Sequence, residues 1–393
     1  MIRSAVQDCI AKMLPYIESA DYAGYDPYDA LNSPLIQRIG AKNKAIRIGA
    51  TQFLRRCPVN LRPLLGIHQG HNPKGLGLFL QSYSSLYPVH HKEKYVGAIN
   101  RLIHLLHETR SSGYAGSCWG YNFPWQSRLI YRPRYTPTIV NTSFIGHALI
   151  DAYEATGNAI AMDMATSAKD FILNDLPRRC EGDLFCFSYS PLEHDYVHNA
   201  NALGASLVLR IARITDNRDL RDTACRGMGY TVSHQREDGA WCFAEGERSW
   251  VDSYHTGYVL ESLRRFVNTN ETGYPDWRAN YERGVAYYAK NFFLEDGTPK
   301  HYDNRVYPID IHSAAEGICF FSGEGPRFRP LTDRVVNWML TNLWDRRGFF
   351  YYRRGRFSVT KISYMRWSQA WALRALVAYA VAVQAIEGYQ HDH

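Results

Sequence analysis

The feature that most constrains this chain is a repeat of a little under sixty residues. Each unit contains a helix-like run, a turn centred on glycine and followed by aromatic residues, and a second helix-like run. The four clearest turns are separated by 57, 58 and 51 positions and are centred on Gly182, Gly239, Gly297 and Gly348. A period of this length is typical of stacked units that bury their apolar faces against one another. We therefore expect an architecture that grows by repetition.

Composition is typical of an ordinary globular protein. Of the 393 residues, 46% are apolar and 21% are charged, and no run of eighteen apolar residues is present to span a membrane. The first residues, MIRSAVQDCIAKMLPYIESADYAG, include acidic and polar side chains where a secretory signal needs an apolar stretch. We expect one continuous domain over residues 1–393, located in the cytoplasm.

Charge and cysteine spacing argue against several classes of function. The formal net charge of +7 is spread along the sequence, without the clustered Lys and Arg of a nucleic-acid surface. The eight cysteines are scattered, with no CxxC pair and no adjacent His, so buried thiols are expected rather than a disulfide framework or a zinc site. The sequence lacks the nucleotide-binding motifs GxxxxGK(S/T) and strand-borne GxGxxG, the serine-hydrolase motif GxSxG and the zinc-protease motif HExxH. We predict no metal, no cofactor and no nucleic-acid partner.

Two kinds of helix alternate along the repeat. Residues 159–175 have an apolar stripe at helical spacing, formed by Ala161, Met164, Ala165, Ala168 and Ile172. Runs such as SFIGHALIDAY and NALGASLVLRIA are instead apolar almost all round, as expected of helices buried on every side. TGN at 156–158 and TDN at 215–217 supply the capping residues of tight turns between the two kinds. Each inner helix is thus followed by an outer one.

These pairs predict an all-α fold, an (α/α)6 toroid of six helical hairpins with short β-like aromatic turns between repeats. We expect inner helices near 74–88, 138–155, 197–214, 254–268, 311–323 and 364–388, and outer helices near 92–108, 159–175, 218–235, 276–292 and 328–345. Residues 71–393 form the repeated hairpins, and residues 1–70 close or cap the ring, with the sixth outer helix at either 4–20 or 35–55. An open helical solenoid is the alternative, but a uniformly buried inner set favours a closed ring.

The repeat also predicts where a functional site lies. Connections from outer to inner helices open at one end of a toroid, so residues just before the inner helices converge there. Asn141, Asn199, Asp252 and His312 each stand five residues ahead of a glycine in an inner helix. Asn and Asp also cap helices, which is the structural alternative for the first three.

Polar neighbours of these positions strengthen the functional interpretation. Histidine, tyrosine and carboxylate residues gather at the same helix starts, and the candidate proton-transfer residues are Asp252, His255, His312, His198, Tyr254, Asp310 and Glu316. The candidate substrate-binding residues are Asn141, Asn199, Tyr258, Arg366 and Trp367, with Trp125, Gln126 and Arg128 from the loop YNFPWQSR. That loop would supply a stacking ring, an amide and a guanidinium, or would simply anchor itself by packing.

Three reactions suit these side chains. An inverting glycosidase needs two carboxyl groups about 6.5–9.5 Å apart, for which Asp252 with Asp310 or Glu316 are candidates. A uronate lyase or 5-epimerase needs a base such as His or Tyr to remove the proton beside a carboxylate, with Asn, His or Arg stabilising the enolate. The set is richer in His, Asn and Tyr than in paired carboxylates, which favours proton abstraction. The 28 Tyr and 9 Trp residues suit sugar rings, whose C–H faces stack on aromatic side chains.

Two sets of motifs resemble known toroid families. GAWCF in HQREDGAWCF is similar to the Gln-to-Trp repeats of squalene and terpenoid cyclases and of the wider α/α-toroid superfamily, although the acidic DxDD-type motif of those cyclases is absent. A second resemblance is to a bacterial α/α-toroid family associated with polysaccharide biosynthesis clusters, and it is carried by the stretches WGYNFPWQSR, TPTIVNTSFIGHALIDAYEATGN, DFILNDL and HNANALGASL. This resemblance implies a role in making or modifying an exported or surface polysaccharide, in association with membrane proteins that assemble it.

The leading hypothesis is an enzyme that acts on an acidic oligosaccharide or polysaccharide by lyase, epimerase or glycoside hydrolase chemistry. One alternative is a non-catalytic toroid that binds or holds a glycan. The other is a toroid that cyclises or binds isoprenoids, which needs a broad apolar cavity.

Overall fold

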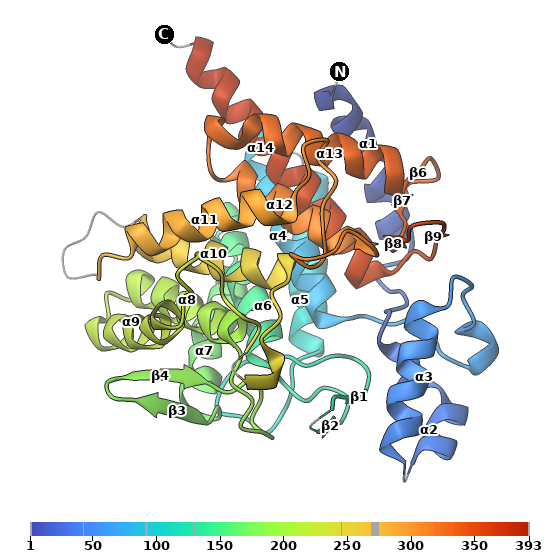
Figure 1. Ribbon diagram of the computed structural model, residues 1–393, viewed down its shortest axis with the longest axis horizontal. Coiled ribbons are helices and arrows are strands. Elements are labelled where there is room, and N and C mark those ends of the chain that lie inside the picture. The colour runs from blue at the N-terminus through green and yellow to red at the C-terminus, as the bar shows by residue number, and fades with distance from the viewer. Residues whose placement is uncertain are drawn as a thin grey trace.

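The computed structural model describes residues 2–41, 43–90, 93–128, 130–244, 246–268 and 275–391. Its inner helices form a closed ring (Figure 1). They are α4 (Pro73–His90), α6 (Ile139–Thr156), α8 (His198–Ile214), α10 (Ser253–Val267), α12 (Ile311–Ser322) and α14 (Trp371–His391). Each packs against the next, and α14 packs against α4. The predicted all-α toroid is confirmed, because an open solenoid would leave its first and last inner helices apart.

The outer layer adds one helix to each inner helix. α5 (Glu93–Glu108), α7 (Ala159–Asn174), α9 (Arg218–Ser233), α11 (Arg278–Phe292) and α13 (Arg329–Leu343) each pack against the inner helix that precedes them. α1 (Ile2–Ser19) lies against α14 and α13 and takes the sixth outer place. Of the two N-terminal candidates for that place, the segment 4–20 is the one used.

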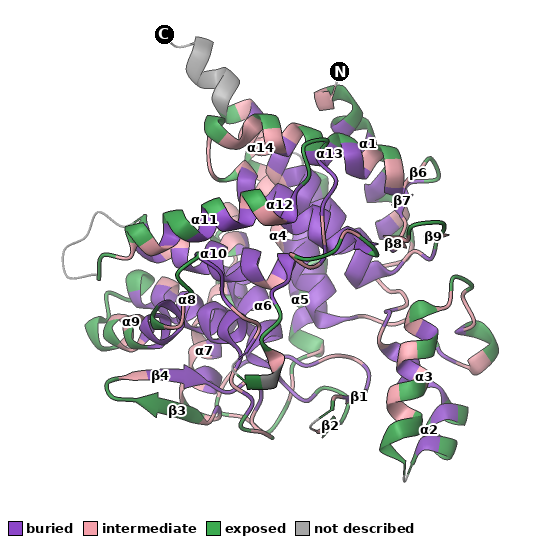
Figure 2. Cartoon of the chain, in the orientation of Figure 1, coloured by how far each residue is buried: buried purple, intermediate pink, exposed green. Residues whose placement is uncertain are grey.

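Burial follows the two layers (Figure 2). In α6 every residue from 139 to 150 is buried, whereas α7 buries one stripe formed by Ala161, Met164, Ala165, Ala168, Phe171 and Ile172. Inner helices approach closely where they carry glycine: a Cβ added at Gly146 would lie 2.6 Å from the Leu207 side chain of α8. Within the described part of the chain, no helix combines the length and apolar character needed to cross a membrane.

Short antiparallel strands connect the repeats. β1 (Trp125–Gln126) pairs with β2 (Tyr131–Arg132), β3 (Arg178–Glu181) with β4 (Leu184–Phe187), and β6 (Trp344–Asp345) with β7 (Phe349–Phe350). A three-stranded sheet has the order β5 (Ile309–Asp310), β8 (Arg353–Arg354) and β9 (Val359–Thr360).

The glycine turns of the repeat have a steric cause. All four turn glycines have positive φ, with values from 59° at Gly182 to 101° at Gly348. At Gly239 an added Cβ would also lie 2.5 Å from the backbone oxygen of Arg283 in the neighbouring outer helix. Any other residue at that position would therefore be strained and would clash.

α2 (Pro34–Gly40) and α3 (Lys44–Arg56) form a small unit that projects from the ring (Figure 1). The unit has its own core, formed by Ala30, Leu31, Ile36, Leu54 and Ile67. Arg62 ties it to the ring, because its guanidinium lies 2.6 Å from Asp29 Oδ1 and donates to the Tyr364 hydroxyl at 2.8 Å. The second candidate for the sixth outer helix, 35–55, lies in this projecting unit.

Candidate functional site

Asp252 and His255 form a hydrogen-bonded pair at the start of α10. Asp252 is the N-cap: its Oδ1 accepts the backbone N–H of His255 at 3.1 Å, and its Oδ2 lies 2.7 Å from His255 Nδ1. Burial alone would raise the pKa of Asp252, but the adjacent His255 lowers it below its ordinary value. The ionised carboxylate fixes Nδ1 of the ring as the donor, which leaves Nε2 as the nitrogen without a proton in the neutral ring. The His255 side chain is 23% exposed, whereas that of Asp252 is 3% exposed.

His312, in the first turn of α12, lies beside this pair. Its ring stacks on Tyr254 with centroids 4.4 Å apart and packs against Trp371 at 4.1 Å. Burial, reinforced by Lys74, places the pKa of His312 well below its ordinary value, so the ring is neutral. The Tyr258 hydroxyl lies 2.6 Å from Nε2, and burial keeps that hydroxyl protonated by raising its pKa. Tyr258 therefore donates to Nε2, and Nδ1 carries a buried proton with no partner among the described residues.

Asp310, Arg366 and Trp367 are predicted site residues that are already engaged by other protein groups. Asp310 caps α12 by accepting the backbone N–H of His312, and it also accepts the Trp367 indole N–H at 2.7 Å. Arg366 forms a buried two-point ion pair with Asp26, at 2.5 and 2.7 Å. Arg366 and Trp367 lie in a π-helical turn, Met365–Ala370, before α14. The Arg366 guanidinium and the Asp310 carboxylate thus each have partners within the protein.

Glu316 belongs to a buried charge network deeper in the ring. Arg374 holds the Glu261 carboxylate at 2.8 and 2.9 Å and lies 3.4 Å from Glu316 Oε2. Burial and the nearby Glu261 raise the pKa of Glu316 well above its ordinary value, whereas the Glu261 pKa is lowered, against its burial, by Arg374. One carboxylate is thus ionised and the other protonated around a single guanidinium.

Lys74 is a central residue that the sequence reasoning did not select. Its side chain is buried in α4, and Nζ lies 4.2, 5.1 and 5.4 Å from the ring centroids of Phe144, Tyr258 and Trp371. Burial and then Arg366 lower its pKa well below the ordinary value. No carboxylate pairs with it among the described residues. A signal was present, because Asn72 stands five residues before Gly77, the same spacing as at the other helix starts.

The two predicted asparagines lie inside the first turns of their helices. Thr138, not Asn141, caps α6, and Val197 occupies the cap position of α8, so capping does not explain Asn141 or Asn199. Both side-chain polar atoms of Asn141 and the Oδ1 of Asn199 are buried without a hydrogen-bond partner among the described residues. Buried amide groups normally have partners, so these two are candidates to bind a ligand or water.

His198 points away from the other candidates. Its ring packs beside Tyr230 of outer helix α9 and beside His234, the residue that caps the end of that helix, with centroids 6.0 and 5.2 Å away. That His198 joins the proton-transfer residues stays a prediction. His198 is the first residue of α8.

The loop residues Trp125, Gln126 and Arg128 face α3. Gln126 Oε1 accepts the Arg47 guanidinium N–H at 2.9 Å, and Lys44 donates to the backbone oxygen of Arg128. The Trp125 ring lies under Arg132, 4.7 Å from its guanidinium carbon. These contacts match the packing alternative, and the structure does not bring the three residues to His255 or His312.

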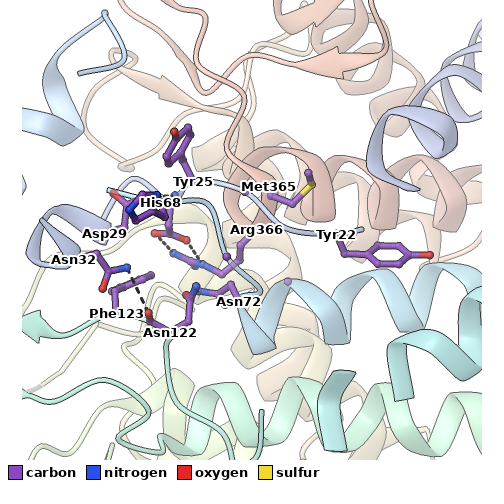
Figure 3. Close-up of a pocket in the computed structure, with 14 residues that line it drawn as sticks. Tyr22, Tyr25, Asp29, Asn32, His68, Asn72, Asn122, Phe123, Met365 and Arg366 are labelled. Carbon is purple, nitrogen blue, oxygen red and sulfur yellow. Dashed lines mark hydrogen bonds and ion pairs between the residues drawn. The ribbon is translucent and has the colours of Figure 1, made fainter. Parts of the chain in front are cut away.

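A small cavity adjoins the Arg366–Asp26 ion pair (Figure 3). It is lined by residues such as Tyr25, His68, Asn72 and Asn122. Its volume of about 10 Å³ is close to that needed by one water molecule and is far too small for a sugar ring. Among the residues described, no three His, Cys, Asp or Glu side chains are grouped as ligands of a metal ion.

The fold is shared with solved structures, although the sequence matches no protein-family model and no curated protein. A cellobiose 2-epimerase from Spirochaeta thermophila superposes with a TM-score of 0.62 at 13% identity, over 81% of this chain and 87% of that one. A GH76 α-mannanase from Bacteroides thetaiotaomicron gives 0.59 at 16% identity, over 81% and 88% of the two chains. A polysaccharide lyase gives 0.59 at 10% identity, over 98% and 99%. At these identities the likeness concerns the fold.

Proposed function

We propose that this protein is a carbohydrate-active enzyme that removes and returns a proton at a sugar carbon, as an epimerase or a lyase does. The observation that carries the proposal is the Asp252–His255 pair, in which a buried, ionised carboxylate orients a partly exposed imidazole. Proteins with this fold include an epimerase, a mannanase and a lyase, all named for action on saccharides. The fold permits many chemistries, so the argument depends on the residues.

In the proposed reaction His255 Nε2 accepts the proton of a C–H bond next to a carbonyl or carboxylate group of the sugar. The electron pair of that bond passes into the adjacent group as an enolate. Asp252 then stabilises the imidazolium that forms, because its carboxylate already accepts the Nδ1 proton. Asp252 is a positioning residue in this scheme, and His255 is the catalytic base.

A second proton-transfer group lies one helical turn from His255. The Tyr258 ring is 5.9 Å from that of His255, and its hydroxyl is hydrogen-bonded to His312. In an epimerase Tyr258 returns a proton to the opposite face of the carbon. In a lyase it protonates the oxygen that leaves as the neighbouring C–O bond breaks. His312 Nε2 accepts the hydrogen bond of this hydroxyl and so holds it in place. The proton that Tyr258 gives up is replaced from solvent.

Lys74 supports an acidic sugar as substrate. A buried ammonium without a carboxylate partner is unfavourable, and its cost is relieved when an anion binds beside it. The carboxylate of a uronic acid supplies such an anion and also acidifies the adjacent C–H bond. The same requirement for charge argues against an uncharged isoprenoid hydrocarbon, which offers no group to pair with Lys74.

Glycoside hydrolysis is the weaker candidate because the carboxylates are committed to other groups. Asp252 is bound to His255, Asp310 to Trp367 and Glu316 to Arg374. An inverting mechanism needs one carboxyl group to activate water and another to protonate the leaving oxygen. The contacts at this site favour a histidine base instead.

The test is incubation with uronic-acid oligosaccharides and neutral oligosaccharides, followed by mass and NMR analysis of the products. An epimerase leaves the mass unchanged, a lyase splits the chain with a new C=C bond, and a hydrolase adds water. We expect the first or second result, lost in His255→Ala and kept in His104→Ala, which alters an exposed His–carboxylate pair on α5. Binding without turnover in the unaltered protein would instead support a glycan-holding toroid, and hydrolysis that survives His255→Ala would refute the proposal.

A further inference from the structure

Exposed apolar side chains are concentrated in the projecting unit. Six of the 16 large hydrophobic residues exposed in the described part of the chain lie between positions 35 and 64. Leu64 is 84% exposed, and Phe53 and Val59 are each 61% exposed. A seventh, Phe357, is 92% exposed at the tip of the β8–β9 hairpin. Single exposed apolar residues are ordinary, but a group of this density marks an interaction surface.

The exposed apolar side chains of each helix in the unit lie on one face of that helix. Leu35 and Ile39 are four residues apart in α2, and Ile46 and Phe53 are seven apart in α3, so each pair lies on one helix face. The adjoining faces, one residue further round each helix, hold the unit's own core, which includes Ile36 and Leu54. The unit is therefore amphipathic, with an apolar side that nothing in the described chain covers.

The β8–β9 hairpin is attached to the same unit. The Arg353 guanidinium donates to the backbone oxygen of Arg56 at 3.4 Å, and Arg55 donates to the Tyr352 hydroxyl at 3.2 Å. Figure 1 shows α3 and the hairpin on one side of the molecule. Phe53, Val59, Leu64 and Phe357, together with Arg56, Arg353, Arg354 and Arg356, are called the basic apolar face below.

Charge on this face has one sign. The sequence contains no Asp or Glu from residue 30 to 92, nor from 346 to 386. The nearest acidic residues before the unit, Asp26 and Asp29, are buried against Arg366 and Arg62. Arg38, Lys44, Arg56 and Arg356 are exposed. A ligand for this face must therefore be negative and must also accept apolar side chains.

We propose that the basic apolar face binds peripherally to the surface of an anionic lipid bilayer. The apolar side chains enter the boundary between headgroups and acyl chains, while the arginines contact lipid phosphates. A bilayer takes up side chains that protrude from a helix face and a hairpin tip without a matching set of pockets. A protein partner would need such pockets together with an acidic rim, so the bilayer is the simpler occupant.

Binding in this way brings the candidate site close to the membrane. Arg353 of β8 pairs with Asp310 of β5, the residue that caps the helix carrying His312. The face is thus joined to the site through one strand pair. A membrane-attached glycan would be delivered to the site by this arrangement, and this last consequence alone rests on the proposed function.

The test is flotation of the full chain with phosphatidylcholine vesicles, with and without phosphatidylglycerol. We expect binding to the anionic vesicles only, weakened by added salt. Phe53→Ser/Phe357→Ser and Arg56→Gln/Arg356→Gln should both reduce it, the second by roughly 25-fold, because each basic residue near a bilayer surface contributes about fivefold. Ile160→Ser/Arg218→Gln, which alters an exposed apolar residue and an exposed arginine of α7 and α9, is the matched control and should bind normally.

Three outcomes would overturn the proposal. The first is that the unaltered protein binds neither kind of vesicle. The second is that the control variant loses as much binding as the two face variants. The third is that the protein forms a dimer which Phe53→Ser/Phe357→Ser dissociates while no vesicle is bound, since the face would then join two copies of the chain. Unchanged thermal unfolding of the variants, which is expected for exposed positions, ensures that lost binding is not lost folding.

Discussion

His255 Nδ1 lies 2.7 Å from Oδ2 of Asp252, and the other oxygen of the same carboxylate caps the helix that carries His255. One buried side chain thus sets both the helix start and the direction of the imidazole. Because Asp252 is 3% exposed and His255 is 23% exposed, the proton acceptor faces outward from a carboxylate that water does not reach. This is the arrangement expected of a general base with its orienting group.

Removal of either member of the Asp252–His255 pair should lower turnover, by a different amount for each residue. We expect His255→Ala to lower kcat by about 10²- to 10⁴-fold, the usual contribution of a general base. Asp252→Asn keeps a helix cap but loses the charge that stabilises the imidazolium, so a smaller loss with a shifted pH profile is expected. Steady-state kinetics across pH distinguishes the two, and equal loss with an unchanged profile would contradict a positioning role for Asp252.

Lys74→Met should stabilise the protein while weakening its action on acidic sugars. The folded-state pKa of Lys74 lies below that of the unfolded chain, so unfolding takes up a proton at pH values between the two, and stability rises as pH rises through that range toward about 10.4. Methionine removes the cost of burying the lysine side chain. We expect the free energy of unfolding to rise by at least about 1 kcal/mol, which corresponds to a pKa shift of less than one unit. Urea unfolding measures the gain, and Lys94→Met on exposed α5 is the control. A destabilised Lys74→Met would show that the ammonium is paired.

The buried ion pair of Asp26 and Arg366 should be costly to break from one side. Asp26→Ala leaves the Arg366 guanidinium buried and unpaired, and a loss of about 3–5 kcal/mol is expected. Asp26→Ala/Arg366→Met removes both charges and should recover part of that loss. Chemical denaturation of Asp26→Ala, Arg366→Met and the double variant measures the coupling, and simple additivity would count against a direct ion pair.

Acid should destabilise the fold through its buried histidines. Burial holds the pKa values of His147 and His312 well below the ordinary value, so both rings are neutral when folded and gain protons on unfolding below about pH 6.5. Their contribution is fully present above that pH and is lost as pH falls, by up to about 1.4 kcal/mol per pH unit for each ring. Denaturation midpoints at about pH 7 and pH 5.5 should therefore differ, and His147→Gln should reduce the difference.

The repeat predicted the ring because each unit carries the same local signals. Gly157 and Asn158 end α6 and begin α7 as their capping preferences require, and the apolar stripe of α7 matches the predicted stripe. The starts of the first five inner helices lie within one residue of the predicted positions. The prediction for the sixth, residue 364, is wrong, because a π-helical turn, Met365–Ala370, comes first and α14 begins at Trp371. The spacing does not decide which N-terminal segment is the sixth outer helix, because both segments have helical spacing.

The site was harder to predict because its contacts join distant repeats. Arg366 pairs with Asp26, 340 positions away, and Arg374 reaches Glu261 across the ring. Periodicity within one unit carries no information on such pairs. It also does not give side-chain direction, such as the packing of the His198 ring beside Tyr230 of α9.

The most direct measurement of the central claim is the exchange of a sugar C–H proton with solvent. The protein is incubated in D2O with uronic-acid oligosaccharides, and NMR follows the carbon next to the carboxylate. We predict deuterium at that carbon in recovered substrate or epimerised product, or its proton lost to solvent if the chain is split, with exchange abolished in His255→Ala and retained in His104→Ala. Turnover without any exchange at that carbon, or exchange that persists in His255→Ala, would contradict proton transfer by the Asp252–His255 pair.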